Sequence, residues 1–172
     1  MPGEVYTIRS ARFDEVELLR EIERAAGCRF AEIGLEQVAE TEPVEIETLQ
    51  SQQRIGQVWV AADAGDRPVG FVVAFELEHA IHIEEISVHP DHGGRGLGRR
   101  LIETLTQWAR QQGYQAITLS TFRDVPWNAP FYERVGFRIV EEWEMSTEVR
   151  GWFREETQVW SPLVRVWMRR GL

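Results

Sequence analysis

The stretch that decides the fold reads Val88-His89-Pro90-Asp91-His92-Gly93-Gly94-Arg95-Gly96-Leu97-Gly98-Arg99-Arg100, and it lies between an expected strand and an amphipathic helix. Glycines let the backbone approach a ligand closely and adopt positive φ angles. The free amides in the first turn of a helix form a site for an anion such as a diphosphate. The arginines add positive charge beside it. The stretch therefore predicts an anion-binding loop that opens a helix.

Other interpretations of this loop fit less well. A Rossmann loop needs a tight GxGxxG after the first strand of a βαβ unit, whereas this chain has GGRGLG after roughly its fourth expected strand. A P-loop is excluded because no Gly-Lys-Ser/Thr follows. A purely structural turn requires fewer glycines and no arginines.

Upstream of the loop, alternating and helical patterns predict a strand, a helix, a mixed segment and a hairpin. Gly27 stands where a C-terminal helix cap is expected. The turn-forming residues 63–68 separate the two hairpin strands. The expected elements are a strand at Val5–Arg9, a helix at Phe13–Ala26, broken helix and loop at Phe30–Arg54, and strands at Val58–Ala62, Val69–Glu78 and Ala80–Val88.

Downstream of the loop, the apolar positions Leu97, Leu101, Leu105 and Trp108 share one helix face, and Gly113 closes that helix. The order of elements predicts one α/β domain over residues 1–172, with a mixed, mostly antiparallel sheet of about six to seven strands and helices on both faces. The remaining expected elements are strands at Ala116–Thr121, Phe137–Glu144 and Leu163–Arg169 and helices at Asn128–Val135 and Ser146–Gln158.

Composition limits the class of protein. The chain has 172 residues, 43% hydrophobic and 27% charged, which is a globular profile. No apolar run approaches the roughly 20 residues of a membrane helix, and no signal-peptide pattern begins the chain, so we expect a cytoplasmic protein without a membrane partner.

The net charge of −9 argues against nucleic acid as a partner and suits a cationic partner. Cys28, the single cysteine, is expected to be a half-buried thiol.

Two segments together resemble one known family. The run Ile83-Glu84-Glu85-Ile86-Ser87-Val88-His89-Pro90, followed by Gly94-Arg95-Gly96-Leu97-Gly98, is similar to the acetyl-coenzyme A-binding motif of the GNAT superfamily of N-acetyltransferases. Asn128-Ala129-Pro130-Phe131-Tyr132-Glu133-Arg134-Val135-Gly136-Phe137 resembles the second characteristic segment of those enzymes. In element order the resemblance extends from Val5 to about Arg169.

The resemblance implies how the co-substrate acetyl-coenzyme A is bound. The backbone of Ile86, Ser87 and Val88 is expected to bind the pantetheine arm in the manner of an added strand. Asn128 is expected to contact this arm, Phe131 to pack against it and Tyr132 to lie near the thioester sulfur. This chain departs from the family pattern at the first position of the loop. The family usually has Gln or Arg there, whereas this chain has Gly93. The residues expected to hold the diphosphate are Gly93, Gly94, Arg95, Gly96, Leu97, Gly98 and Arg99.

The resemblance also implies catalytic roles. Tyr132 is the candidate acid that protonates the leaving thiolate, and Glu84 is the preferred general base, directly or through water. Glu85 and His82 are the alternatives to Glu84. The histidines His82, His89 and His92 are otherwise expected at the surface or in loops, and no ligand spacing suggests a metal.

The sequence thus predicts an N-acetyltransferase that moves an acetyl group from acetyl-coenzyme A to a primary amine of a small molecule or peptide. The alternative is a non-catalytic acyl-coenzyme A-binding module. The acceptor is expected to depend on Phe30–Arg54 and the tryptophan-rich tail, where most of the tryptophans should fill a core or an interface. A homodimer is compatible with these tryptophans.

Overall fold

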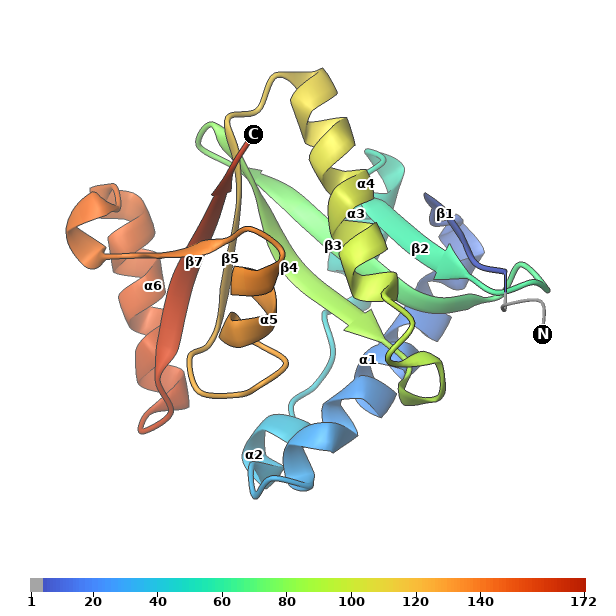
Figure 1. Cartoon of the computed structure of the whole chain (residues 1–172), viewed down its shortest axis with the longest axis horizontal. Helices are drawn as coiled ribbons and strands as arrows, with labels where there is room; N and C mark the ends of the chain where they lie inside the picture. Colours follow the sequence, from blue (N-terminus) through green and yellow to red (C-terminus); the bar gives the residue numbers. More distant parts are fainter. Residues whose placement is uncertain (1–4) are drawn as a thin grey trace. The chain divides into compact units, whose positions relative to one another are not determined.

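In the computed structural model, which describes residues 5–172, hydrogen bonds join seven strands in the order β1-β2-β3-β4-β5-β7-β6 (Figure 1). β4 pairs with β5 in parallel, and β1–β2, β2–β3, β5–β7 and β6–β7 pair antiparallel. The predicted mixed, mostly antiparallel sheet is confirmed. The strands are β1 Thr7–Ser10, β2 Val58–Ala62, β3 Pro68–Leu77, β4 Ala80–Val88, β5 Ala116–Phe122, β6 Arg138–Val140 and β7 Arg165–Gly171.

The first three helices follow β1, and one further helix follows each of β4, β5 and β6. They are α1 Val16–Ala31, α2 Glu36–Ala39, α3 Ile46–Arg54, α4 Leu97–Gln112, α5 Ala129–Arg134 and α6 Thr147–Trp160, with 3₁₀ turns η1 Phe13–Glu15, η2 Pro90–His92 and η3 Glu142–Glu144. The chain forms two compact units. The first contains the described residues up to Phe75 and Glu84–Trp108, and the second contains Glu76–Ile83 and Ala109–Leu172.

The core of the first unit forms between two strands and two helices. Strand residues on one face of β2 and β3 pack against apolar residues of α1 and α3, because alternate side chains of a strand point to the same face. Removing each of these large side chains from water contributes about 1.5–3 kcal/mol to folding. The cluster consists of Ala11, Val16, Leu19, Ile22, Leu49, Val58, Val60, Phe71 and Val73.

The opposite face of β2 contacts α4. Trp59 lies between Val58 and Val60 in the strand, so its side chain points the other way. It meets Trp108 of α4 edge to face, with ring centroids 5.1 Å apart. Within the first unit, α1 and α4 therefore cover opposite faces of the sheet, as the sequence predicts.

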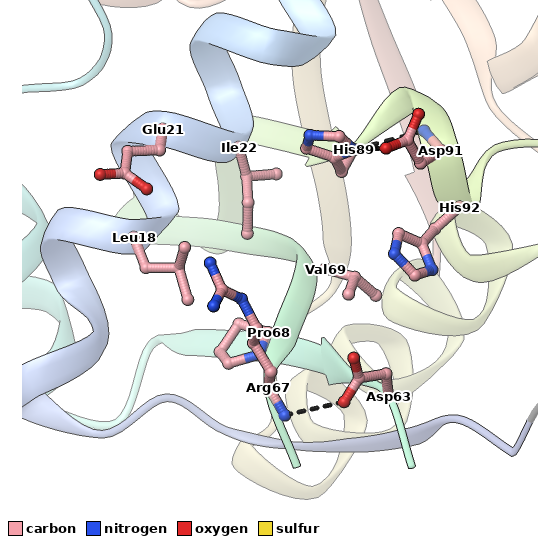
Figure 2. A pocket seen from close by; sticks show the side chains of 10 residues that line it. All are labelled: Leu18, Glu21, Ile22, Asp63, Arg67, Pro68, Val69, His89, Asp91 and His92. Carbon is pink, nitrogen blue, oxygen red and sulfur yellow. Dashed lines mark hydrogen bonds and ion pairs between the residues drawn. The ribbon is translucent and has the colours of Figure 1, made fainter. Parts of the chain in front are cut away.

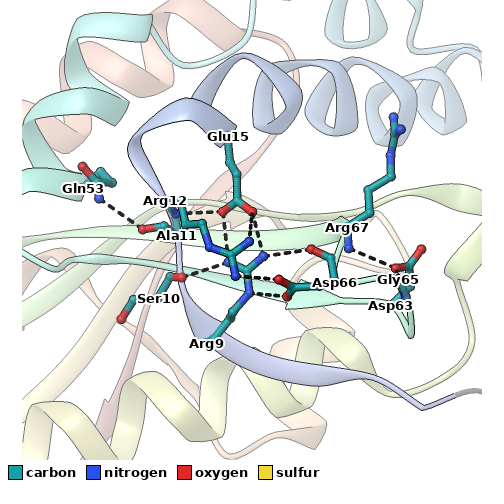
Figure 3. Close-up of polar contacts among 10 residues, drawn as sticks. All are labelled: Arg9, Ser10, Ala11, Arg12, Glu15, Gln53, Asp63, Gly65, Asp66 and Arg67. Carbon is teal, nitrogen blue, oxygen red and sulfur yellow. Dashed lines mark hydrogen bonds and ion pairs between the residues drawn. The ribbon is translucent and has the colours of Figure 1, made fainter.

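An ion-pair network ties β1 to the β2–β3 turn (Figure 3). Arg9 donates from Nη2 to Glu15 Oε1 and from Nε to Asp66 Oδ1, both at 2.7 Å. Arg12 Nη2 donates to Asp66 Oδ2 at 2.5 Å. These hydrogen bonds from Arg12 and Arg9 lower the pKa of Asp66, which sits in the turn with a φ of 62°. Because Glu15 directly precedes α1, these ion pairs hold the start of α1 close to β1 and to the β2–β3 turn.

The second unit has its own core around β7. Trp167 packs with Val140 of β6 and with Val149 and Phe153 of α6. β7 pairs with β5 on one side and with β6 on the other. Trp167 is 3% exposed whereas Trp143 is 78% exposed, so the late tryptophans do not all fill a core.

Some predicted boundaries are wrong. Gly27 does not cap α1, which continues to Ala31, and the chain turns instead at Gly34 with a φ of 79°. A Cβ on Gly27 would lie 3.7 Å from the carbonyl oxygen of Ala39, which is an ordinary van der Waals contact, so the end of α2 lies close to α1 at this position. The only cysteine, Cys28, is exposed rather than half-buried.

The strand predicted for Phe137–Glu144 is also too long. β6 ends at Val140, and η3 occupies Glu142–Glu144. The backbone amide of Glu141 donates to Glu144 Oε2 at 2.9 Å, and Arg138 pairs with the same carboxylate at 2.8 Å. These bonds stabilise the turn in place of further strand pairing.

Candidate functional site

The glycine loop leaves β4 and turns directly into α4. The His89 amide donates to the carbonyl of Val69 at 2.8 Å, which holds the end of β4 to β3. Gly94 and Gly96 have φ angles of 72° and 73°, a region that side-chain-bearing residues rarely adopt. The predicted role of these glycines in shaping the loop therefore rests on their backbone conformation, because a Cβ on either would meet no atom within 4 Å.

The N-terminus of α4 presents amide donors. The amide of Arg100 donates to the carbonyl of Gly96 at 3.1 Å, as the helical pattern requires. The amides of the preceding first-turn residues have no acceptor within the helix. Together with the partial positive charge of a helix N-terminus, they form a site suited to a diphosphate. These first-turn residues are Leu97, Gly98 and Arg99.

The arginines of the loop have different environments. Arg95 Nη1 donates to the carbonyl of Asp91 at 2.6 Å, and this hydrogen bond stabilises the conformation of the loop. Arg100 Nη2 donates to the carbonyl of Tyr6 at 2.8 Å, so this guanidinium ties α4 to the segment before β1. Arg99 is exposed and makes no side-chain hydrogen bond within residues 5–172. Arg99 is therefore the arginine best placed to pair with a phosphate.

The glycine at the first loop position has a steric explanation. The Gly93 amide donates to the carbonyl of Pro90 at 3.0 Å and closes η2. A Cβ on Gly93 would lie 3.1 Å from that same oxygen, tighter than ordinary van der Waals contact. The side chain that the family usually carries here would crowd this turn.

The β4 carboxylates lie in the first unit with the glycine loop. Ser87 Oγ donates to Glu85 Oε1 at 2.7 Å, which places both side chains on one face of the strand. Glu85 is half-buried, Glu84 is exposed, and Ile86 and Val88 are half-buried. The candidate bases thus differ in their access to solvent.

A further carboxyl, Glu23 of α1, lies in this region and was not predicted. Burial, followed by the charge of Glu85, raises the pKa of Glu23 to about 8, although the Val44 amide opposes this shift. The sequence does contain a signal for it. Glu23 follows Leu19 by four positions and Val16 by seven, so it continues the buried stripe of α1.

The second unit contains the predicted short-helix residues. The Tyr132 amide donates to the Asn128 carbonyl at 3.1 Å, so Tyr132 of α5 lies one turn from Asn128, which caps the start of that helix, as predicted. Tyr132 is 8% exposed, and its ring contacts Phe131 and Phe137. The Oδ1 atom of Asn128 is buried and accepts no hydrogen bond from any described residue. A buried acceptor of this kind fits the amide N–H of an extended ligand such as the pantetheine arm.

The expectation that His82 lies at the surface is wrong. It is 3% exposed, its ring stacks on Trp167 at 4.6 Å, and its Nδ1 lies 2.9 Å from Thr118 Oγ1. Burial, with a smaller effect of the Arg165 charge, lowers the pKa of His82 to about 3. His82 is therefore a much weaker proton acceptor than an ordinary histidine.

A pocket of about 250 Å³ lies in the first unit, between α1, the β2–β3 turn and the chain that leaves β4, and Figure 2 shows the side chains that line it. The pocket has apolar and polar walls but includes none of the residues predicted to bind or act on the co-substrate. It is lined by Leu18, Glu21, Ile22, Asp63, Arg67, Pro68, Val69, His89, Asp91 and His92.

Within the described chain, no three His, Cys, Asp or Glu side chains are arranged to hold a metal ion. No helix among residues 5–172 has the length and apolar character required to cross a bilayer.

The end of β4, the positive-φ glycines and the N-terminus of α4 together have the backbone geometry of a candidate anion site. The family model described as "Acetyltransferase (GNAT) family" matches residues 17–137, and the chain belongs to this family. The peptidyl-lysine N-acetyltransferase YjaB of Escherichia coli is 29% identical over 143 residues, 78% of this chain and 84% of that protein.

Two further N-acetyltransferases match parts of this chain, and one solved structure shares its fold. The uncharacterised N-acetyltransferase MJ1207 of Methanocaldococcus jannaschii is 33% identical over 99 residues, 54% of this chain and 41% of that protein. The matches to MJ1207 and to a rat N-acetyltransferase 8F1 span 41% and 32% of the lengths of those relatives. The structure of the PaiA N-acetyltransferase of Thermoplasma acidophilum with coenzyme A superposes with a TM-score of 0.71 at 16% identity, covering 98% of this chain and 99% of that one.

Proposed function

We propose that the chain transfers an acetyl group from acetyl-coenzyme A to a primary amine of a small molecule or peptide. The observation that carries the proposal is the loop from Gly93 to Arg99, where two glycines with positive φ open a helix whose first amides lack helical acceptors. Such an arrangement suits a diphosphate, and coenzyme A carries one.

The remaining predicted residues support the same ligand. The strand residues Ile86, Ser87 and Val88 offer backbone groups to an extended arm, in the manner of an added strand. Asn128 Oδ1 is a buried acceptor without a partner in residues 5–172, and an amide N–H of the arm would satisfy it. Phe131 would pack against the arm. The bound thioester supplies the activated acetyl group.

Glu84 is proposed as the general base and Tyr132 as the general acid. The acceptor must lose a proton before its nitrogen can attack, and an exposed carboxylate can take that proton directly or through water. Glu85, on the same strand, is the alternative. A phenol keeps its proton at neutral pH and can donate it to the leaving sulfur.

The acceptor is proposed to be a cationic amine. Glu84 and Glu85 of β4 place two carboxyl groups in the first unit, and the chain carries a net charge of −9. The similarity to a peptidyl-lysine acetyltransferase agrees with an amine on a flexible chain. The cytoplasmic location and the homodimer stay predictions.

The test is a thiol-release assay with acetyl-coenzyme A against amines, polyamines, amino acids, amino sugars and lysine peptides. Release that depends on one class of amine would support the proposal and name the acceptor. Tight binding of acetyl-coenzyme A with no release from any amine would favour a non-catalytic acyl-coenzyme A-binding module. No binding would contradict both.

A further inference from the structure

Tyr6, which directly precedes β1, contacts the chain on both sides of the glycine loop. On the side that leads into the loop, its Oη atom lies 2.9 Å from His92 Nδ1, and the two rings meet edge to face with centroids 5.8 Å apart. On the side that leaves the loop, the Tyr6 carbonyl accepts from Arg100 Nη2 at 2.8 Å. One residue is therefore bonded to the chain just before Gly93 and just after Arg99.

Tyr6 is itself held in place by elements outside the loop. It is 8% exposed, and the next residue, Thr7, begins β1, which pairs with β2 over its whole length. Arg9 of the same strand donates to Glu15 and to Asp66, both at 2.7 Å. The position of Tyr6 is thus independent of the conformation of the loop that it contacts.

The glycine loop needs such a fixed contact. The Gly93 amide donates to the Pro90 carbonyl at 3.0 Å, but this bond joins residues of the same turn. Gly94 and Gly96 have positive φ angles, and glycine has more backbone freedom to lose than any other residue. Ordering a flexible loop when a ligand binds weakens the affinity. Bonds from a fixed residue on both sides of the loop reduce that cost.

We propose that Tyr6 is a positioning residue for acetyl-coenzyme A, because its bonds to His92 and Arg100 keep the loop amides directed at the diphosphate. This inference rests on the proposed function. Tyr6 acts through the loop and takes no part in proton transfer. Loss of its hydroxyl should therefore raise KM for the acyl donor and leave kcat unchanged.

Calorimetric titration of coenzyme A tests the positioning without requiring turnover. Tyr6→Phe keeps the ring and the carbonyl but lacks the hydroxyl that contacts His92, so it should raise the Kd of coenzyme A about three- to tenfold. His92→Leu should raise the Kd similarly, and the double variant should lose no more than either single variant, since both changes break the same bond. His92→Asn should recover part of the affinity, because its Oδ1 can accept from the hydroxyl instead of Nδ1.

Gln53→Leu is the matched control within the first unit. Gln53 Nε2 donates to the Ala11 carbonyl at 3.1 Å, so this variant also loses a hydrogen bond between distant residues but leaves the loop unchanged. Its melting temperature should fall like that of Tyr6→Phe, whereas its Kd for coenzyme A should stay within about twofold of the parent value.

Two acyl donors separate an effect on the loop from a general loss of function. S-acetylpantetheine carries the thioester and the arm but no diphosphate. With the amine found in the thiol-release assay, Tyr6→Phe should lower kcat/KM about three- to tenfold for acetyl-coenzyme A, through KM, and less than about twofold for S-acetylpantetheine.

An equal loss with both donors, or an unchanged Kd for coenzyme A in Tyr6→Phe, would overturn the inference. Weaker coenzyme A binding in Tyr6→Phe, together with a parent protein that turns over no amine, would support the role of Tyr6 and count against the proposed function.

Discussion

The amide of Arg100 donates to the carbonyl of Gly96 at 3.1 Å, and Gly96 itself has a φ of 73°. The residue that accepts this early hydrogen bond of α4 is therefore one of those whose backbone conformation favours glycine. A substitution at Gly96 would disturb both the loop and the direction in which the first amides of α4 point.

Gly96→Val should abolish binding of coenzyme A. A β-branched side chain at this φ costs about 1–2 kcal/mol and moves the loop out of its conformation. The measurement is the thermal shift produced by coenzyme A, since a ligand that binds only the native state raises the melting temperature. Gly113→Val is the matched control: Gly113 has a φ of 85° with no atom near its Cβ position, and it lies at the far end of α4. An equal coenzyme A shift in both variants would contradict the assignment of the loop.

Glu84→Gln should lower turnover near neutral pH by about 10²-fold or more, with little change in coenzyme A affinity, if Glu84 is the base. Activity should recover partly at high pH, because the amine then loses its proton unaided. Steady-state rates of Glu84→Gln and Glu85→Gln, compared across pH, identify the carboxylate that acts. Glu47→Gln, an exposed change on α3, controls for the loss of one charge. A parent-like rate in Glu84→Gln would move the role to Glu85.

Tyr132→Phe should reduce kcat by roughly 10- to 10³-fold while coenzyme A affinity changes little, because only the proton-donating hydroxyl is removed. Steady-state kinetics and calorimetric titration of coenzyme A provide the two readouts. Tyr114→Phe is the control, since its hydroxyl donates to Glu76 Oε2 at 3.1 Å on the surface of the second unit. Full activity in Tyr132→Phe would make the tyrosine a packing residue, whereas weak binding with normal kcat would make it a binding residue.

Glu23 should make folding stability fall as pH rises. Its pKa in the folded protein is raised to about 8 from an ordinary 4.5, chiefly by burial, so the folded state binds the proton more tightly than the unfolded state. The stabilisation is fully present below pH 4.5 and is lost as pH rises toward about 8. Melting temperatures from pH 5 to 9 should decline less steeply in Glu23→Gln than in the parent. Parallel curves would show that Glu23 has an ordinary pKa.

Local sequence patterns were sufficient to predict the segment that runs from β4 through the glycine loop to α4. The predicted strand at Ala80–Val88 matches β4, and the predicted closure at Gly113 matches a residue with a φ of 85°. Turn chemistry and helix periodicity depend on residues close together in the sequence, so they can be recognised without knowledge of the fold. The one-turn spacing of Asn128 and Tyr132 could be predicted for the same reason, because the two residues are only four positions apart in the sequence.

Only the tertiary structure decided the surroundings of individual side chains. Glu23 and Glu85 are 62 positions apart in the sequence, and His82 and Trp167 are 85 apart, yet each pair interacts. The pKa of a buried group depends on which distant residues exclude water from it and which charges remain near it. Gly27 illustrates the same limit, because it lies inside α1 and beside Ala39 rather than at the end of a helix. Residues that are neighbours in the chain determine helices, strands and turns, whereas burial and charge are set by neighbours in space.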